Sequence, residues 1–179
     1  MKLLVGLVDT LKYLRSTSTE SRKDEEAVED LLDSAFSPSR IHLSSYSLRK
    51  GVGKIDSLCF VAKRDTGDIL GVVRQWPIII GDNPKNVGLL TGPLAVHPIF
   101  QGEGIGSSLL KLSLGRSKEK GWKRAILIGD LEYYQNFGFY LQVDVKVIFP
   151  SPTDPKRVLL LELQKDSFKG LGGHVRGYH

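Results

Sequence analysis

The sequence predicts a single α/β domain, and three stretches carry this prediction. Between residues 58 and 96, short apolar runs alternate with turn residues, which is typical of an antiparallel meander of strands. A glycine-rich turn at 101–106 leads into an amphipathic segment that runs to Lys120, which predicts a helix. The apolar run 124–128 then predicts a buried strand. No internal repeat or low-complexity linker interrupts the 179 residues, a length that suits one domain.

Each element is predicted from a local pattern. Ser21 and Asp24 resemble a capping box, and the apolar residues after them follow helical spacing until Pro38 ends the helix. We expect residues 1–11 to be a loose extension and residues 12–179 to form the domain. The predicted strands are 13–16, 58–62, 69–80, 87–96, 124–128, 143–149 and 158–163. The predicted helices are the one between the capping box and Pro38, an irregular 39–50, 105–120 and 131–136. The glycine-rich tail from Lys169 is expected to be irregular.

Composition excludes several classes of protein. Hydrophobic residues make up 41% of the chain, enough for a real core. Cys59 is the only cysteine, which excludes a disulfide framework and a cysteine-rich metal site, so we expect no metal. No apolar run approaches the roughly 20 residues of a membrane span. The apolar first residues could be a signal peptide, but Asp9 interrupts them, and a cytoplasmic protein is the better expectation.

The net charge of +5 is unevenly distributed. Residues 20–33 hold seven acids and two bases, whereas residues 111–124 hold six bases and one acid. The simpler interpretation is two solvated helix faces of opposite sign, and the alternative is a basic side that attracts a polyanionic ligand. The basic segment lacks interleaved aromatic residues, which disfavours nucleic acid as a partner.

The glycine-rich turn predicts an anion site. Its glycines let a ligand approach the backbone, and the N–H groups that open the following helix attract negative charge. One interpretation is a dinucleotide fingerprint, since Gly102-x-Gly104-x-x-Ser107 nearly matches G-x-G-x-x-G/A and Asp130 follows the next strand. Against it, residues 98–101 separate strand from glycines, and too little chain follows for a doubly wound sheet.

The second interpretation is a cradle for the pyrophosphate of coenzyme A. Gln101-x-x-Gly104-x-Gly106 resembles the Q/R-x-x-G-x-G/A motif of the GNAT superfamily of N-acetyltransferases, and the segment Tyr134–Phe139 resembles that family's Y-x-x-x-G-F. Residues 92–98 and 129–134 resemble its YhbS-type bacterial branch. The resemblance covers residues 12–165. It implies a mixed, mostly antiparallel sheet of six to seven strands, flanked by helices and splayed at the fourth strand.

The resemblance also implies a mechanism. Acetyl-CoA would be the co-substrate, and an acetyl group would pass directly to a primary amine on a small molecule or peptide. Tyr134 matches the general acid that protonates the departing thiolate. Because Pro93 has no N–H, Leu94 or Val96 would supply the backbone oxyanion donor, with Leu94 preferred. The implied cofactor-binding residues are Leu94, Ala95, Val96, Gln101, Gly102, Glu103, Gly104, Ile105, Gly106, Ser107 and Tyr134.

The roles of several candidate site residues have alternative interpretations. Tyr134 sits in an aromatic cluster that could simply be core, and Glu103 should point to solvent because it would repel phosphate. Cys59 and His97 are interpreted as structural. The general base could be Asp82, Asp130, Glu132 or a water chain. The usual family asparagine upstream of the tyrosine is absent, and Leu127 and Asp130 occupy that region.

Two other functions remain open from the sequence. The chain could be a CoA-binding regulatory module without turnover, or an acetyltransferase directed at RNA. Residues 37–56, 81–86 and 150–156 are expected to decide the acceptor. Either a monomer or a homodimer is expected.

Overall fold

The computed structural model describes residues 16–143 and 145–179, and their packing divides the chain into two units. Unit 1 comprises the residues up to Arg40 together with Ile55–Arg74 and Pro93–Arg116. Unit 2 comprises Ile41–Lys54, Gln75–Gly92 and Ser117–His179. The predicted extension at residues 1–11 lies outside the described residues, and a single domain over 12–179 stays a prediction.

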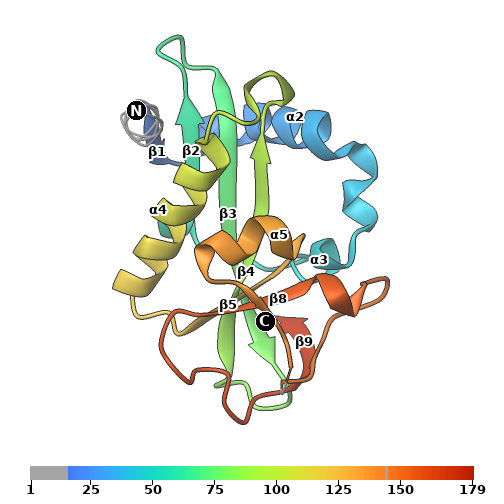
Figure 1. The fold of residues 1–179 in the computed structure, drawn as a ribbon. Coiled ribbons are helices and arrows are strands. Elements are labelled where there is room, and N and C mark those ends of the chain that lie inside the picture. The colour runs from blue at the N-terminus through green and yellow to red at the C-terminus, as the bar shows by residue number, and fades with distance from the viewer. Residues whose placement is uncertain (1–15, 144) are drawn as a thin grey trace. The chain divides into compact units, whose positions relative to one another are not determined.

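The described strands form a mixed, mostly antiparallel sheet in the order β1-β2-β3-β4-β5-β8-β6, with β9 added to β3 and to β7 (Figure 1). Within the described residues β4 pairs with β5 and β7 with β9 in parallel, whereas β1–β2, β2–β3, β3–β9, β5–β8 and β6–β8 pair antiparallel. The strands are β1 (Thr17–Thr19), β2 (Phe60–Lys63), β3 (Ile69–Ile80), β4 (Val87–Val96), β5 (Arg124–Ile128), β6 (Tyr140–Leu141), β7 (Val147–Ile148), β8 (Val158–Glu162) and β9 (Gly173–Gly177). The helices are α2 (Glu25–Phe36), α3 (Ser44–Ser47), α4 (Ile105–Glu119) and α5 (Leu131–Tyr134).

In unit 1, two helices cover opposite faces of the same strands. Helix α2 packs on one face, in a buried cluster formed by Val28, Leu31, Leu32, Val61, Val72 and Ala95. Gly71 faces the other way, and a Cβ there would lie 3.0 Å from the side chains of Ile105 and Leu109. Helix α4 therefore approaches the strand backbone closely at Gly71, and Figure 1 shows it crossing β2 and β3.

Helix α2 begins as its sequence predicts. The Ser21 N–H donates to the Asp24 carboxylate at 2.9 Å, in the predicted capping box. Lys63 on β2 donates to the same carboxylate at 2.6 Å. Burial raises the pKa of Asp24, but the hydrogen bonds from Lys63 and Ser21 outweigh it and hold that pKa below its ordinary value.

A buried arginine joins α2 to β3. Arg74 donates to the carboxylate of Glu20 through Nη2 at 2.6 Å and through Nε at 3.0 Å, and its Nη1 donates to Glu29 at 2.7 Å. Arg40 binds the other oxygen of Glu29 at 2.6 Å and Asp33 at 2.9 Å. The acidic stretch 20–33 is thus only partly a solvated face, because four of its acids form ion pairs.

Unit 2 has its own core around the second half of β3 and the first half of β4. Its buried members are Leu48, Ile78, Ile80, Leu90, Ile126, Val147, Phe149, Val158, Leu160, Phe168 and Val175. The even-numbered residues of β5 face this cluster. Its odd-numbered residues face the side on which α5 lies, since a Cβ at Gly129 would meet the Tyr134 ring on α5.

Three predicted elements differ from the structure. The strand expected at 13–16 lies outside the described residues except for Ser16, and β1 forms at Thr17–Thr19. The strand expected at 143–149 is reduced to β7. The tail predicted to be irregular forms β9, whose Val175 to Gly177 pair with Ile80 to Ile78 of β3. These short strands bring the sheet to nine strands over the described residues, against the six to seven expected.

Candidate functional site

Strand β4 is paired with β5 over only part of its length. Leu89 pairs with Ala125 and Leu90 with Ile126, and no later pair joins the two strands in the described part of the chain. Gly92 has φ 129°, a conformation that favours glycine, and Pro93 has no N–H to donate. The predicted break in the strand ladder therefore coincides with the end of the parallel pairing, just before Leu94.

The predicted backbone contacts follow this break. Ala95 is buried in the unit 1 core, whereas Leu94 and Val96 are half-buried. The Val96 carbonyl accepts a hydrogen bond from the Gln101 side chain at 3.3 Å. Gln101 thus ties the end of β4 to the glycine-rich turn, a role that its motif position did not reveal.

The glycine-rich turn has a backbone that requires its glycines. Gly102 has φ 84° and Gly104 has φ 83°, and a Cβ at either position would meet no atom within 4 Å. The turn is therefore open around both positions. Helix α4 starts at Ile105, and its first hydrogen bond runs from the Ser108 N–H to the Gly104 carbonyl at 3.0 Å. The N–H groups of a helix's first turn generally point out of its end rather than to carbonyls of the same helix.

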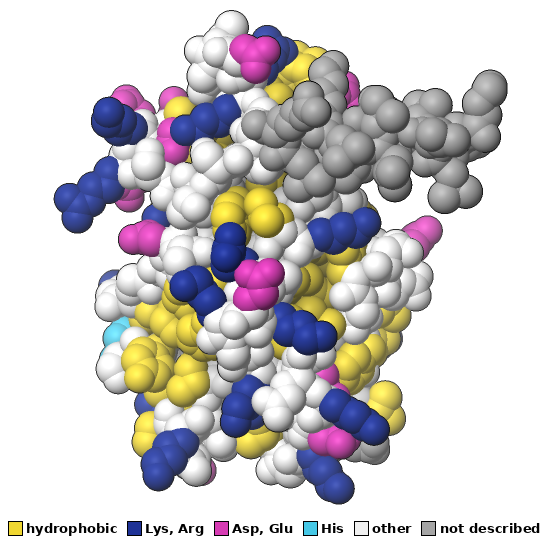
Figure 2. All heavy atoms as spheres, turned by 90° about the vertical axis from the view of Figure 1, so that its left-hand side faces the viewer, with side chains coloured by type: hydrophobic (Ala, Val, Ile, Leu, Met, Phe, Trp, Pro, Cys, Tyr) yellow, Lys and Arg dark blue, Asp and Glu magenta, His cyan; other side chains and the backbone are white. Residues whose placement is uncertain are grey.

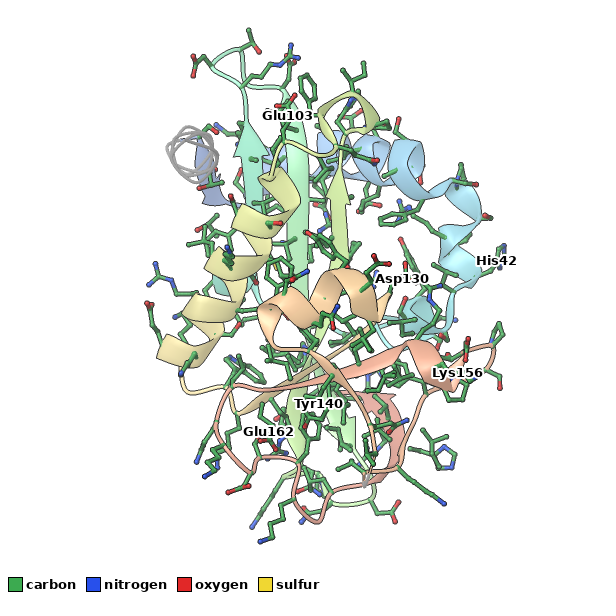
Figure 3. All side chains as sticks on the ribbon, viewed as in Figure 1. His42, Glu103, Asp130, Tyr140, Lys156 and Glu162 are labelled. Carbon is green, nitrogen blue, oxygen red and sulfur yellow. The ribbon has the colours of Figure 1, made fainter. Side chains whose placement is uncertain are left out.

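These features fit an anionic cofactor group. A helix of 15 residues carries partial positive charge at its first turn, and the open glycines allow a phosphate to approach the backbone. Glu103 is exposed on this turn, as expected, and Figure 3 labels it just before α4. His97 accepts a hydrogen bond from the Ile99 N–H at 3.3 Å, which agrees with a structural role at the end of β4.

Tyr134 lies at the end of α5, in unit 2. Its ring makes edge contacts with Tyr133, at a centroid distance of 4.9 Å, and with Phe139, at 5.9 Å. Burial, followed by the charges of Tyr133 and Asp130, raises the pKa of Tyr134 to about 12, although Arg157 acts in the opposite direction. The phenol is therefore protonated at neutral pH, the state required of a proton donor.

The candidate general bases are not equivalent. Asp130, labelled in Figure 3, immediately precedes α5. It forms an ion pair of 3.2 Å with Arg157, which the sequence did not indicate. Asp82 follows β3 and lies at the end where β4 and β5 begin, since the Val87 carbonyl accepts from Arg124. Five strand residues separate the ends of β5, about 17 Å. Asp82 therefore lies beyond the end of β5 opposite to Gly129 and α5, and its role as general base stays a prediction.

Two of the three segments expected to decide the acceptor meet within unit 2. Thr153 donates to the Ser44 hydroxyl at 2.5 Å, which joins α3 to the loop that precedes β8. A mostly apolar hollow of about 200 Å³ adjoins this loop and is lined by Gln142, Lys146, Val147, Ile148, Phe149, Thr153, Pro155 and Val158. The third segment, 81–86, lies with Asp82 at the remote end of the strands.

The predicted site residues thus divide between the two units. Leu94 to Val96 and Gln101 to Ser107 belong to unit 1, where β4, the turn and α4 hold them in one continuous stretch. Tyr134, Asp130 and Glu132 belong to unit 2. Cys59 is a buried free thiol whose Sγ donates to the Ile55 carbonyl at 3.2 Å, in agreement with a structural role.

The described residues hold no group of three or more His, Cys, Asp or Glu side chains that could bind a metal ion. No helix within the same residues is long and apolar enough to cross a membrane. Figure 2, which views the side on which α4 lies in Figure 1, shows Lys and Arg side chains separated by apolar and uncharged atoms. This distribution supports the simpler interpretation of the basic segment.

Comparisons with known proteins agree with one another. The family model for the acetyltransferase (GNAT) domain matches residues 56–141. The uncharacterised N-acetyltransferase YhbS of Escherichia coli K12 is 30% identical over 126 residues, which cover 69% of this chain and 72% of that protein. Its crystal structure in complex with CoA has a TM-score of 0.75 at 26% identity, with 91% of this chain and 88% of that chain covered. A GNAT family acetyltransferase from Brucella melitensis in complex with acetyl-CoA has a TM-score of 0.65 at 26% identity, with 91% and 94% covered.

Proposed function

Because this chain belongs to the GNAT family of acetyl-CoA-dependent N-acetyltransferases, we propose that it transfers the acetyl group directly to the primary amine of a small molecule or peptide. The main structural support for this proposal is the continuous stretch from the end of β4, through the open glycine turn, to the first turn of α4. We further propose that it works in the cytoplasm as a monomer or homodimer.

The glycine turn would hold the pyrophosphate of acetyl-CoA. Backbone N–H groups in the stretch Gln101–Ser107 would donate to the phosphate oxygens, although that of Gln101 also donates to the Pro98 carbonyl at 3.4 Å. The positive end of α4 would favour the charge of the phosphates. Two features of the turn support this assignment. Gly102 and Gly104 adopt positive φ angles that favour glycine, and a Cβ at either position would meet no atom within 4 Å, so a phosphate can approach the backbone there. Glu103, being exposed, does not oppose it.

The end of β4 would hold the pantetheine arm and the acetyl carbonyl. Strand β4 continues past its last pair with β5, so Leu94, Ala95 and Val96 would offer main-chain groups to the arm as an added strand would. The Leu94 N–H would donate to the thioester carbonyl, which acetyl-CoA supplies as the activated acyl group. Pro93 is excluded as the donor because it has no N–H, and Val96 is the alternative to Leu94.

Tyr134 would act as general acid. A phenol is protonated at neutral pH already at its ordinary pKa of 10, and burial raises the pKa of Tyr134 to about 12, so it can donate to the sulfur as negative charge develops there. Asp130 is the preferred candidate for the amine's proton, because it directly precedes α5 and its charge acts on Tyr134. Residues 41–54 and 150–157, joined through Thr153 and Ser44, would form a wall of the acceptor site.

The test combines binding with turnover. Acetyl-CoA is titrated calorimetrically into wild type and Tyr134→Phe, and CoA thiol release is then measured with a panel of primary amines. We expect Tyr134→Phe to bind acetyl-CoA as wild type does and to lose about 10²-fold or more in turnover. Tyr133→Phe is the matched control, because it removes the neighbouring hydroxyl and keeps the ring.

The outcomes separate the proposal from its alternatives. Full turnover in Tyr134→Phe would remove Tyr134 from the mechanism. Tight acetyl-CoA binding without transfer to any amine would instead indicate a CoA-binding module without turnover. Salt-sensitive binding of tRNA would indicate an RNA-directed enzyme. The comparisons support neither alternative.

A further inference from the structure

We infer that Gly129 is a positioning residue, whose missing side chain leaves the space that the Tyr134 ring occupies. A Cβ at Gly129 would lie 2.3 Å from Cε2 and 2.8 Å from Cδ2 of Tyr134. Carbon atoms in contact are ordinarily about 3.5–4.0 Å apart. Any side chain at position 129 would therefore occupy the same space as the ring. The inference rests on the proposed function, in which Tyr134 is the general acid.

The backbone at Gly129 is fixed on the side away from the ring. Its N–H donates to the Arg157 carbonyl at 2.9 Å, next to the pair that Ile128 forms with Val158. The Cδ1 of Leu127 would lie 3.0 Å from the same Cβ. A shift of the backbone would break the hydrogen bond or press on Leu127, so the clash has to be relieved by the Tyr134 ring.

The Tyr134 ring has little room to turn in place, because the Tyr133 and Phe139 rings contact it at centroid distances of 4.9 and 5.9 Å. Tyr134 is anchored through its backbone, because its N–H donates to the Asp130 carbonyl at 3.2 Å and its own carbonyl accepts from Phe139 at 3.3 Å. Relief of the clash therefore requires rotation of the side chain about its own bonds. A turn about the Cβ–Cγ bond leaves the phenolic oxygen on the rotation axis, whereas a rotation about the Cα–Cβ bond displaces it. We infer the second movement, because Tyr133 and Phe139 pack against the ring.

This placement gives Gly129 a role distinct from that of the glycines in the turn. Gly102 and Gly104 adopt positive φ angles and have open space around them. Gly129 instead has a neighbour that is too close for a Cβ, and the neighbour is the proposed proton donor. Proton transfer depends on hydrogen-bond distance, so a misplaced phenol should lose catalysis while cofactor binding is kept.

The experiment compares Gly129→Ala with two other variants. We expect Gly129→Ala to lower kcat by about tenfold or more, with acetyl-CoA affinity within about twofold of wild type. In the Tyr134→Phe background, the same substitution should change kcat by less than about twofold, because the hydroxyl that it displaces is already absent. Gly115→Ala on α4 is the matched control, since a Cβ there meets no atom within 4 Å.

A second measurement follows the phenol directly. In protein labelled with ¹³C-tyrosine, the Tyr134 signal is assigned by its loss in Tyr134→Phe and then followed with pH. The wild-type pKa is expected at about 12. In Gly129→Ala the pKa of Tyr134 should fall toward its ordinary value of 10, because the displaced ring is less buried.

Folding is controlled by a stability cycle with Tyr134→Ala. Gly129→Ala should lower Tm in the wild-type background but not in the Tyr134→Ala background, where no ring is present for the Cβ to meet. An equal loss of Tm in both backgrounds would overturn the inference. If Gly129→Ala alone does not fold, recovery of folding in the double variant supports it, and failure of the double variant overturns it.

The activity results separate this inference from the proposed function. A slow Tyr134→Phe combined with a normal Gly129→Ala would overturn the positioning role alone. Full turnover in Tyr134→Phe would remove the proposed role of Tyr134, and the positioning role would fall with it.

Discussion

Removing one member of the buried ion pair between Arg74 and Glu20 should lower the free energy of unfolding strongly. Replacing both members by apolar residues should lower it little. The Glu20 side chain is 0% exposed and that of Arg74 is 7% exposed, so neither charge is solvated. Arg74→Met removes the guanidinium and leaves the Glu20 carboxylate buried without its main partner. Breaking a buried pair in this way costs about 3–5 kcal/mol. Glu29 adds little to the loss, because Arg40 still binds it at 2.6 Å.

Replacing both members should restore most of this stability. In the double variant Glu20→Leu with Arg74→Met, no buried charge remains, and such replacements are often neutral or stabilising. For a chain of 179 residues, a loss of 3–5 kcal/mol corresponds to a Tm lower by about 6–20 °C. The single variant should show this loss, and the double variant should recover at least half of it.

Urea unfolding monitored by circular dichroism at pH 7 measures the free energies, and thermal scans measure Tm. Glu26→Gln on α2 is the control, since its side chain is exposed. The reasoning is refuted if Arg74→Met costs less than about 1 kcal/mol, the level of an exposed ion pair. It is also refuted if the double variant is no more stable than the single one.

Three further outcomes are expected. Gly104→Leu should abolish acetyl-CoA binding in calorimetry, because leucine resists a φ of 83° by about 1–2 kcal/mol and brings a side chain into the turn; binding at wild-type affinity would contradict the proposed cradle. The pH profile of kcat should show no loss attributable to Tyr134 below about pH 10, since its raised pKa keeps the phenol protonated; a fall centred near pH 8 that is absent from Tyr134→Phe would contradict its role. The pKa of Glu29 is raised by burial but lowered more by Arg74 and Arg40, so its stabilisation is complete above its ordinary value of 4.5 and is lost as the pH falls below it. The fall in Tm between pH 6 and pH 3 should therefore be smaller in Glu29→Gln, and an unchanged fall would contradict this.

The sequence predicts the central strands best. The bounds of β3, β4 and β5 agree with the predicted ones, because long apolar runs between turn residues are local signals that do not depend on distant partners. The capping box at Ser21 and Asp24 is likewise confirmed, because its signal lies within four consecutive residues. The glycine turn and Tyr134 were located through motif spacing, and their assigned roles stay predictions.

What the sequence does not reveal depends on contacts between distant residues. Strand β9 lies in a glycine-rich segment with weak strand propensity and forms because Arg176 pairs with Ile79, 97 positions earlier. The pair of Arg157 with Asp130 and the close approach of Tyr134 to Gly129 depend on the direction of side chains after folding. A local pattern contains no information about either.

The pairing of β9 with β3 also has a consequence for synthesis. During translation, Ile78 to Ile80 are synthesised about 95 residues before Val175 to Gly177. At ordinary synthesis rates, this part of β3 is therefore without its partner strand β9 for roughly 5–20 seconds. During that interval an apolar strand edge is open to other nascent chains. Chaperone dependence of the newly made protein should therefore be determined by these three residues of β3, and a premature stop before residue 173 should give aggregated product.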